Sequence, residues 1–264
     1  LRHRLLTATR RVLNDAGFTE IETPILTKST PEGARDYLVP SRIVPGAFYA
    51  LPQAPQQYKQ LLMVAGLDRY YQIARCFRDE DLRADRQPEF TQIDLEMSFV
   101  APEDVFAVVD RLLAVLMREA DCGEVSLPLP RLTWREAMDR FGSDKPDLRF
   151  GMELTDIGAI FAQTRFKVFA SVLASGGVVK AVNAKQLAGA SLGTLDDWEE
   201  IAKSMGLAGL AHIRVQPDGV WKSPVVKFFS EEEKQALGQA LDIQAGDLIL
   251  FAAGPAQQVN PALG

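Results

Sequence analysis

The sequence predicts a mixed α/β protein of the α+β kind with two domains. Alternating apolar and polar residues on both sides of a charged loop predict an antiparallel hairpin over residues 69–100. From about residue 152 the composition shifts toward Gly, Ala and Val, and short strands and helices interleave. A chain of 264 residues with 47% hydrophobic side chains can bury two cores. We therefore predict one domain over residues 1–150 and a second over residues 151–264.

The charge and the cysteine content exclude several classes of protein. A net charge of −6 argues against nonspecific coating of nucleic acid, because that function needs a basic face. No apolar run approaches the roughly 18 residues of a membrane-spanning helix, so we expect no membrane role. His3, His212, Cys76 and Cys122 supply neither a disulfide framework nor a zinc site of usual spacing. This cysteine usage indicates a reducing, cytoplasmic compartment.

The first segments predict a helix, a strand and a long loop. Apolar residues at helical spacing followed by Gly17 predict a helix over residues 1–16. Because it lacks an initiator Met and runs directly into a strand, we interpret it as a core helix of a longer protein and not as a transit peptide. The strand covers residues 18–23 and is closed by Pro24. Prolines, a glycine and several charges over residues 29–40 predict a mobile loop of functional size.

The middle of the first domain predicts the hairpin. A helix is expected over residues 56–67 and the two strands over residues 69–78 and 90–100. The second strand has an apolar face and a polar face, formed respectively by Thr91, Ile93, Leu95, Met97 and Phe99 and by Gln92, Asp94, Glu96 and Ser98. An amphipathic helix over residues 102–119 and a Pro-rich connector over residues 127–130 follow.

The second domain predicts an α+β unit. Capping-box patterns at residues 194–197 and 230–233 predict the starts of two helices. The predicted strands cover residues 166–173, 178–182, 211–215 and 248–252.

The charged loop between the hairpin strands carries the strongest chemical signal. Arg78 stands at the end of a predicted strand, where a rigid backbone can hold a guanidinium against phosphate oxygens. Asp94 on the polar face can pair with an amine, and an adenine can stack on Phe90 with an Arg on its other side. The residues alone indicate a polar-faced sheet suited to a nucleotide, and a solvated hairpin tip stays open as the alternative.

Several motifs resemble one family. Residues 77–80 with Phe90 resemble motif 2 of class II aminoacyl-tRNA synthetases, and residues 17–24 resemble motif 1. Residues 31–36 resemble the flipping loop of bacterial aspartyl-tRNA synthetases, and residues 53–60 resemble their aspartate-binding segment.

The resemblance covers essentially the whole chain. Residues 83–94 are similar to the motif 2 loop of the same bacterial family, and the similarity continues through residues 141–150. Bacterial members then carry an inserted domain that they share with a subunit of the tRNA-dependent amidotransferase. The resemblance implies a class II antiparallel-sheet catalytic domain over residues 1–150 and this inserted α+β domain over residues 151–264.

The resemblance also implies an activity. Members activate L-aspartate with ATP and Mg²⁺ to aspartyl-adenylate and transfer the aspartyl group to the 3′ end of tRNA(Asp), with tRNA(Asn) as an open second acceptor. They are cytoplasmic homodimers formed through motif 1. Arg78 is the implied catalytic residue, because it would hold the α-phosphate and the substrate carboxylate. The implied ATP-binding residues are Arg78, Asp79, Glu80, Gln87 and Phe90. The implied aspartate-binding residues are Glu32, Gln56, Lys59, Arg78 and Asp94.

Other readings of these residues remain open. Lys59 can be a solvated charge on a helix, and Glu32 and Gln56 can be local caps. Many relatives have Ser where Ala54 stands, so one hydroxyl contact near the amino acid is missing. The sequence contains no recognisable motif 3, no further acids for Mg²⁺ and no second Arg for the aspartate side chain. We therefore expect the 264 residues alone to be inactive in adenylation.

Two alternative functions can be compared with that of a tRNA ligase. A non-catalytic synthetase paralogue that binds RNA would lose the ATP residues, whereas Arg78, Glu80 and Phe90 are all present. A class II relative that amidates free aspartate would lack an inserted domain, whereas residues 151–264 are present. Both observations favour the tRNA ligase.

Overall fold

The protein divides into two compact units, Leu1–Pro130 and Arg131–Gly264. The computed structural model describes residues 1–30, 32–81, 86–149 and 151–264. The sheets are mainly antiparallel and are mixed with helices, which confirms the predicted fold class. The division between the units falls at the Pro-rich connector, and the assignment of functional domains on either side of residue 150 stays a prediction. Among the described residues, no helix is both long enough and apolar enough to cross a membrane.

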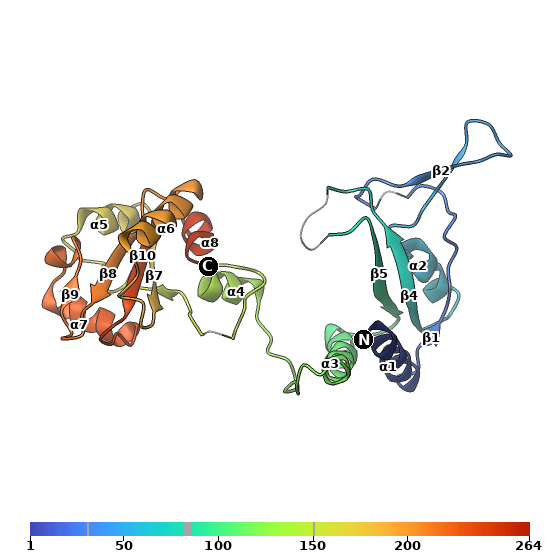
Figure 1. Cartoon of the computed structure of the whole chain (residues 1–264), viewed down its shortest axis with the longest axis horizontal. Helices are drawn as coiled ribbons and strands as arrows, with labels where there is room; N and C mark the ends of the chain where they lie inside the picture. Colours follow the sequence, from blue (N-terminus) through green and yellow to red (C-terminus); the bar gives the residue numbers. More distant parts are fainter. Residues whose placement is uncertain (31, 82–85, 150) are drawn as a thin grey trace. The chain divides into compact units, whose positions relative to one another are not determined.

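The first unit is organised around the predicted hairpin (Figure 1). Its elements are α1 (Arg2–Asp15), β1 (Thr19–Glu20), β2 (Leu38–Pro40), β3 (Phe48–Ala50), α2 (Gln56–Val64), β4 (Arg69–Phe77), β5 (Glu89–Met97) and α3 (Pro102–Glu119). Strands β4 and β5 pair antiparallel along their whole length, and β1 joins β4 in parallel. The predicted helices at residues 1–16, 56–67 and 102–119 are confirmed, as is the hairpin.

The two faces of the hairpin have different roles. On one face Leu13, Phe18 and Tyr71 form a buried cluster, against which Ile93 and Leu95 of β5 pack. Burial of these side chains fixes the register, because a slip of one residue would turn the apolar set outward. Helices α1 and α3 lie side by side (Figure 1). The polar side chains of β5 are consequently left on the opposite face, which α2 contacts.

Three predictions in this unit need correction. The strand predicted over residues 18–23 is limited to Thr19–Glu20. The predicted loop over residues 29–40 ends in the short strand β2. Phe99 was assigned to the buried face, but β5 ends at Met97, and Phe99 has a φ of 57° and is 98% exposed. A turn with positive φ breaks the period of two on which the assignment depended.

The second unit is a sheet covered by helices on both faces. Its elements are α4 (Trp134–Phe141), β6 (Thr155–Asp156), α5 (Lys167–Ala174), β7 (Val178–Ala184), α6 (Leu192–Ser204), β8 (Ala211–Val215), β9 (Trp221–Lys222), a short 3₁₀ turn η1 (Val226–Phe228), α7 (Glu231–Ala240), β10 (Leu248–Gly254) and α8 (Ala256–Leu263). The strand order is β6-β7-β10-β8-β9, and the neighbouring strands are antiparallel. The predicted strands at residues 178–182, 211–215 and 248–252 and the helix start at residue 230 are confirmed.

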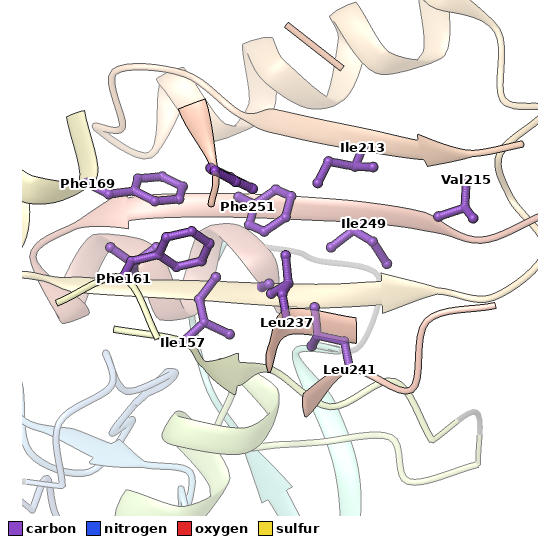
Figure 2. Packing of buried hydrophobic residues seen from close by; sticks show 12 residues of the cluster. Ile157, Phe161, Phe169, Ile213, Val215, Leu237, Leu241, Ile249 and Phe251 are labelled. Atoms are coloured by element: carbon purple, nitrogen blue, oxygen red, sulfur yellow. The ribbon is translucent and has the colours of Figure 1, made fainter. Parts of the chain in front are cut away.

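An aromatic core lies on one face of this sheet (Figure 2). Phe161 and Phe169 meet edge to face with their ring centroids 5.2 Å apart. The ring centroid of Phe251 on β10 lies 6.2 Å from that of Phe169. Leu237 of α7 closes the core and is fully buried. On the opposite face Ala202 of α6 and Val259 of α8 pack together with residues of β10.

Two predictions in the second unit are wrong. The segment predicted as a strand over residues 166–173 forms helix α5 (Lys167–Ala174), with Phe166 as its N-cap. Phe166, Phe169 and Leu173 contact the core at helical spacing, while Val168 between them is 53% exposed. The helix predicted to start at Thr194 begins at Leu192. Its cap is Ser191, whose hydroxyl accepts a hydrogen bond from the Thr194 N–H at 3.0 Å.

Asp247 is expected to stabilise the second unit. It is fully buried and accepts hydrogen bonds from the Gln244 N–H, the Gln186 N–H and the Asn183 amide at 2.9, 3.1 and 3.0 Å. Burial raises the pKa of Asp247, but the hydrogen bonds from Asn183, Gln244 and Gln186 outweigh it and lower the pKa. Its contribution is therefore present above the unfolded pKa of about 3.9 and is lost as the pH falls through the folded pKa.

We expect Asp247→Asn to destabilise the unit by about 3 kcal/mol at pH 7, since one acceptor oxygen is replaced by a donor. Denaturant unfolding at pH 7 and at acid pH measures this effect, and the difference between variant and wild type should shrink at acid pH. Asp242→Asn is the matched control, because the Asp242 side chain is 79% exposed. Equal stability of Asp247→Asn and wild type would contradict the account.

Candidate functional site

The polar face of the β4–β5 hairpin brings several of the predicted site residues together. The strand register places Gln72 opposite Asp94 and Cys76 opposite Phe90. Alternation along each strand sends these side chains to the face that α2 contacts. Rigid, paired strands therefore position the candidate site, while α2 and the loop between β1 and β2 supply the rest.

Lys59 enters this face from α2 as a buried cation. Its Nζ lies 2.9 Å from the Asp94 Oδ1 and 3.3 Å from the Glu96 Oε2. Burial lowers the pKa of Lys59, but the hydrogen bonds and charges of Asp94 and Glu96 outweigh it and raise the pKa. Lys59 thus stays protonated and is not a solvated charge. Glu96 was placed on the polar face by the sequence but was not assigned to the site.

Asp94 offers a binding position for a cation. Its side chain is only 10% exposed, and its Oδ1 is taken by Lys59. Its Oδ2 is buried and has no hydrogen-bond partner among the described residues. A buried carboxylate oxygen without a partner is costly. A ligand ammonium beside Oδ2 would remove that cost.

Arg78 and Phe90 form one wall of a second part of the site. The Arg78 N–H donates to the Pro88 carbonyl at 2.9 Å, which anchors the residue just beyond the end of β4. Its guanidinium lies over the Phe90 ring, 5.1 Å from the ring centroid. Ligand pockets usually measure roughly 300–1,000 Å³. The cavity at this wall measures about 370 Å³, which suits part of a nucleotide. It is lined by Arg78, Glu80, Arg86, Gln87 and Phe90.

Asp79 does not line the cavity beside Phe90, but it lines a neighbouring one together with Glu80 and Arg86. The Asp79 carbonyl accepts a hydrogen bond from the Arg35 Nε at 3.2 Å, and its carboxylate lies 3.9 Å from the same nitrogen. Glu80 is 3.3 Å from Arg86, a cation in the cavity that the sequence analysis did not assign. The predicted motif 2 residues 82–85 lie outside the described residues, as do Pro31 and Phe150.

Gln53, in the connection between β3 and α2, forms hydrogen bonds with the predicted flipping loop. Gln53 is 2% exposed, and its amide bonds the Ala34 N–H, the Ala34 carbonyl and the Asp36 carboxylate at 3.1, 2.8 and 2.6 Å. Glu32 accepts a hydrogen bond from the Thr30 hydroxyl at 3.0 Å. Glu32 and Ala54 line a cavity of about 320 Å³. The sequence placed Gln53 in the aspartate-binding segment without seeing that it holds the loop.

Gln56 begins α2 and lies one turn before Lys59. Its side chain is half-buried. No cap hydrogen bond from a side chain is made at the start of this helix. Its predicted role toward the amino acid remains a prediction.

Comparison with known proteins identifies the family of the chain. The family model described as tRNA synthetases class II (D, K and N) matches residues 1–244. The chain therefore belongs to the class II tRNA synthetase family that comprises the D, K and N enzymes.

Particular relatives are aspartate enzymes. The chain is 57% identical over 264 residues to the aspartate–tRNA(Asp/Asn) ligase of Desulfatibacillum aliphaticivorans, which covers 100% of the chain and 44% of the relative. It is 58% identical over 265 residues to the aspartate–tRNA ligase of Bacillus licheniformis, covering 100% of the chain and 45% of the relative. Identity to the aspartate–tRNA(Asp/Asn) ligase of Bacillus subtilis is 57% over 265 residues, with the same shares. The chain thus spans less than half the length of these curated relatives.

Proposed function

We propose that the protein containing this chain is an aspartate–tRNA ligase. It joins L-aspartate to ATP, forming aspartyl-adenylate and pyrophosphate, and then transfers the aspartyl group to the 3′ end of a tRNA. The observation that carries the proposal is the buried Lys59–Asp94 pair, in which Asp94 keeps one unpartnered oxygen. The identity of 54–58% to curated aspartate enzymes supports it.

The amino-acid end of the site suits aspartate. Asp94 Oδ2 accepts from the ligand ammonium, and Glu32 approaches the same ammonium from the loop. Lys59 has three N–H groups, and beside Asp94 and Glu96 its only other described acceptor is the Leu95 carbonyl, 3.5 Å from the Nζ. The ligand side-chain carboxylate would take the N–H that makes this long contact. Gln56 contacts the amino acid from the start of α2. A cation in this position favours aspartate over uncharged side chains.

The nucleotide end supplies positioning and charge. Phe90 carries the adenine, with Glu80, Asp79 and Gln87 around ATP. Arg78 donates to the α-phosphate and to the ligand α-carboxylate, bringing the two reactants together. A carboxylate oxygen attacks the α-phosphorus, the bond to the bridging oxygen breaks, and pyrophosphate leaves with the electron pair. Arg78 stabilises the charge that accumulates during this step. No side chain forms a covalent bond.

Mg²⁺ accompanies ATP in this proposal as its usual partner. Among the described residues, no group of three or more His, Cys, Asp or Glu side chains is arranged to hold a metal ion. We therefore assign no Mg²⁺ ligand among the described residues.

The proposal extends to partners of the whole protein. We infer a cytoplasmic homodimer that forms through the motif 1 region, where Ile25 and Leu26 are exposed apolar side chains. The acceptor is tRNA(Asp), with tRNA(Asn) as a second acceptor, because relatives are named for both. Light scattering of the purified protein measures the dimer. Charging of the two purified tRNAs decides between one acceptor and two.

Amino-acid-dependent ATP–pyrophosphate exchange tests the function. We expect the full-length protein to exchange with aspartate and to exchange about ten- to a hundredfold less efficiently with asparagine, because a hydrogen-bonded ionic contact with Lys59 is worth about 1.5–3 kcal/mol. Lysine is the second comparison, since the wider family includes lysine enzymes. Exchange that depends on lysine or asparagine more than on aspartate would refute the proposal.

A further inference from the structure

Cys76 is a buried group in the site that the proposed reaction does not use. It lies on β4, two residues before Arg78 and opposite Phe90 in the strand register. Its exposure is 0%, so no ligand can touch the sulfur. The pKa of the Cys76 thiol is affected by the charges of four proposed site residues, so the thiol lies among them. These residues are Arg78, Asp94, Glu32 and Lys59. A role for Cys76 must therefore pass through a neighbouring side chain.

That neighbour is Gln92. The Cys76 Sγ lies 3.3 Å from the Gln92 Oε1. Burial raises the pKa of the Cys76 thiol to about 11, so the sulfur carries its proton at neutral pH and acts as a donor. A thiol that donates requires an acceptor, and in an amide the oxygen is the only acceptor. The Ala74 carbonyl, 3.9 Å from the Sγ, is the more distant acceptor. The nearer contact therefore favours the orientation in which the Gln92 Oε1 faces the thiol.

A fixed amide oxygen also fixes the amide NH₂ group. The side-chain amide is planar, so its NH₂ stands on the edge away from the thiol. Within the described residues the Gln92 Nε2 has no hydrogen-bond partner, and it is not a buried unpaired atom, so a ligand can reach it. Ala74 stands opposite Gln92 in the register.

Gln92 and Asp94 are two residues apart on the same strand, so their side chains share one face. Gln92 offers two N–H donors, and Asp94 offers one unpartnered acceptor. A neighbouring donor and acceptor suit the carboxylate and the ammonium of an α-amino acid.

We propose that Cys76 is a positioning residue of the amino-acid site: its thiol holds the Gln92 amide so that the NH₂ group donates to the carboxylate of the bound amino acid. This inference rests on the proposed function and adds Gln92 to the residues that contact the ligand. Cys76 itself contacts neither substrate. Its effect should therefore appear in aspartate binding and not in ATP binding.

Three Cys76 variants separate positioning from packing. Cys76→Ser keeps a donor, while Cys76→Ala and Cys76→Val remove it, and Val fills the space. We expect the KM for aspartate in exchange to rise about fivefold in Ala and Val, the effect of losing one ordinary hydrogen bond, and to stay within about twofold in Ser. The KM for ATP should not change. A packing role predicts the opposite order, with Val closest to wild type and Ser impaired.

Gln92 supplies the second arm of the test. Gln92→Leu should raise the KM for aspartate by at least as much as Cys76→Val, and Cys76→Val should add nothing in that background. If Cys76→Ala folds poorly, Cys76→Val is compared with Cys76→Ser in its place. The inference would be overturned if the effects of Cys76→Val and Gln92→Leu on the KM for aspartate were additive, or if the KM values for aspartate and ATP changed equally. It would also be overturned if Cys76→Val were closest to wild type and Cys76→Ser were impaired. Wild-type protein without aspartate-dependent exchange would overturn the proposed function as well, so the two failures are distinguishable.

Discussion

Replacing Arg78 with Ala in the full-length protein is expected to lower aspartate-dependent ATP–pyrophosphate exchange by about a thousandfold or more. The guanidinium lies over the proposed adenine platform, 5.1 Å from the Phe90 ring centroid. Loss of a phosphate-clamping Arg in phosphoryl-transfer sites costs about a thousandfold or more. Lys should restore only part of the rate, because an ammonium cannot form the planar two-point contact.

Arg75→Ala is the matched control for Arg78→Ala. Arg75 lies on β4, three residues before Arg78, its side chain is 54% exposed, and it pairs with Glu89 at the protein surface. We expect its exchange rate to stay near that of wild type. If the Arg78→Ala protein exchanged at the wild-type rate, Arg78 would have no part in the reaction.

Lys59→Ala is expected to raise the KM for aspartate by about ten- to a hundredfold and to leave the KM for ATP nearly unchanged. The substitution removes a charge-assisted contact worth about 1.5–3 kcal/mol to one of the two ligands. It also leaves Asp94 and Glu96 without their shared cation, so thermal stability should fall. Kinetics with each substrate varied separately measure the difference.

The control for Lys59→Ala is Gln60→Ala, the next residue on α2, whose side chain is exposed. It should change neither KM nor stability. Equal losses for aspartate and ATP in Lys59→Ala would indicate a folding defect and would contradict a specific role in amino-acid binding.

The hairpin was predictable because its sequence alternates strictly. Ile93 and Leu95 pack on the core side, while Asp94 between them takes the other face. Residues 166–173 were mispredicted because their valines and phenylalanines suit a strand locally, whereas the core selects the helical spacing of Phe166 and Phe169.

Two helices escaped prediction for different reasons. Helix α4 is short, although Thr133 and Glu136 form a capping box that could have revealed it. Helix α8 contains Pro261, a residue that usually ends a helix.

The sequence named candidate site residues but could not give their geometry. The family motifs named Lys59 and Asp94, but their contact joins residues 35 positions apart in the chain, which no local pattern specifies. The buried hydrogen bond between Cys76 and Gln92 depends on the same strand pairing. Such contacts follow from register and burial, so they become visible only once the chain is folded.

The most direct measurement is the structure of the full-length protein bound to a non-hydrolysable analogue of aspartyl-adenylate. The account predicts the ligand ammonium within hydrogen-bond distance of the Asp94 Oδ2, the ligand side-chain carboxylate on the Lys59 Nζ, and the adenine on Phe90. An analogue bound away from the polar face of β4 and β5, or one whose ammonium does not meet Asp94, would contradict it.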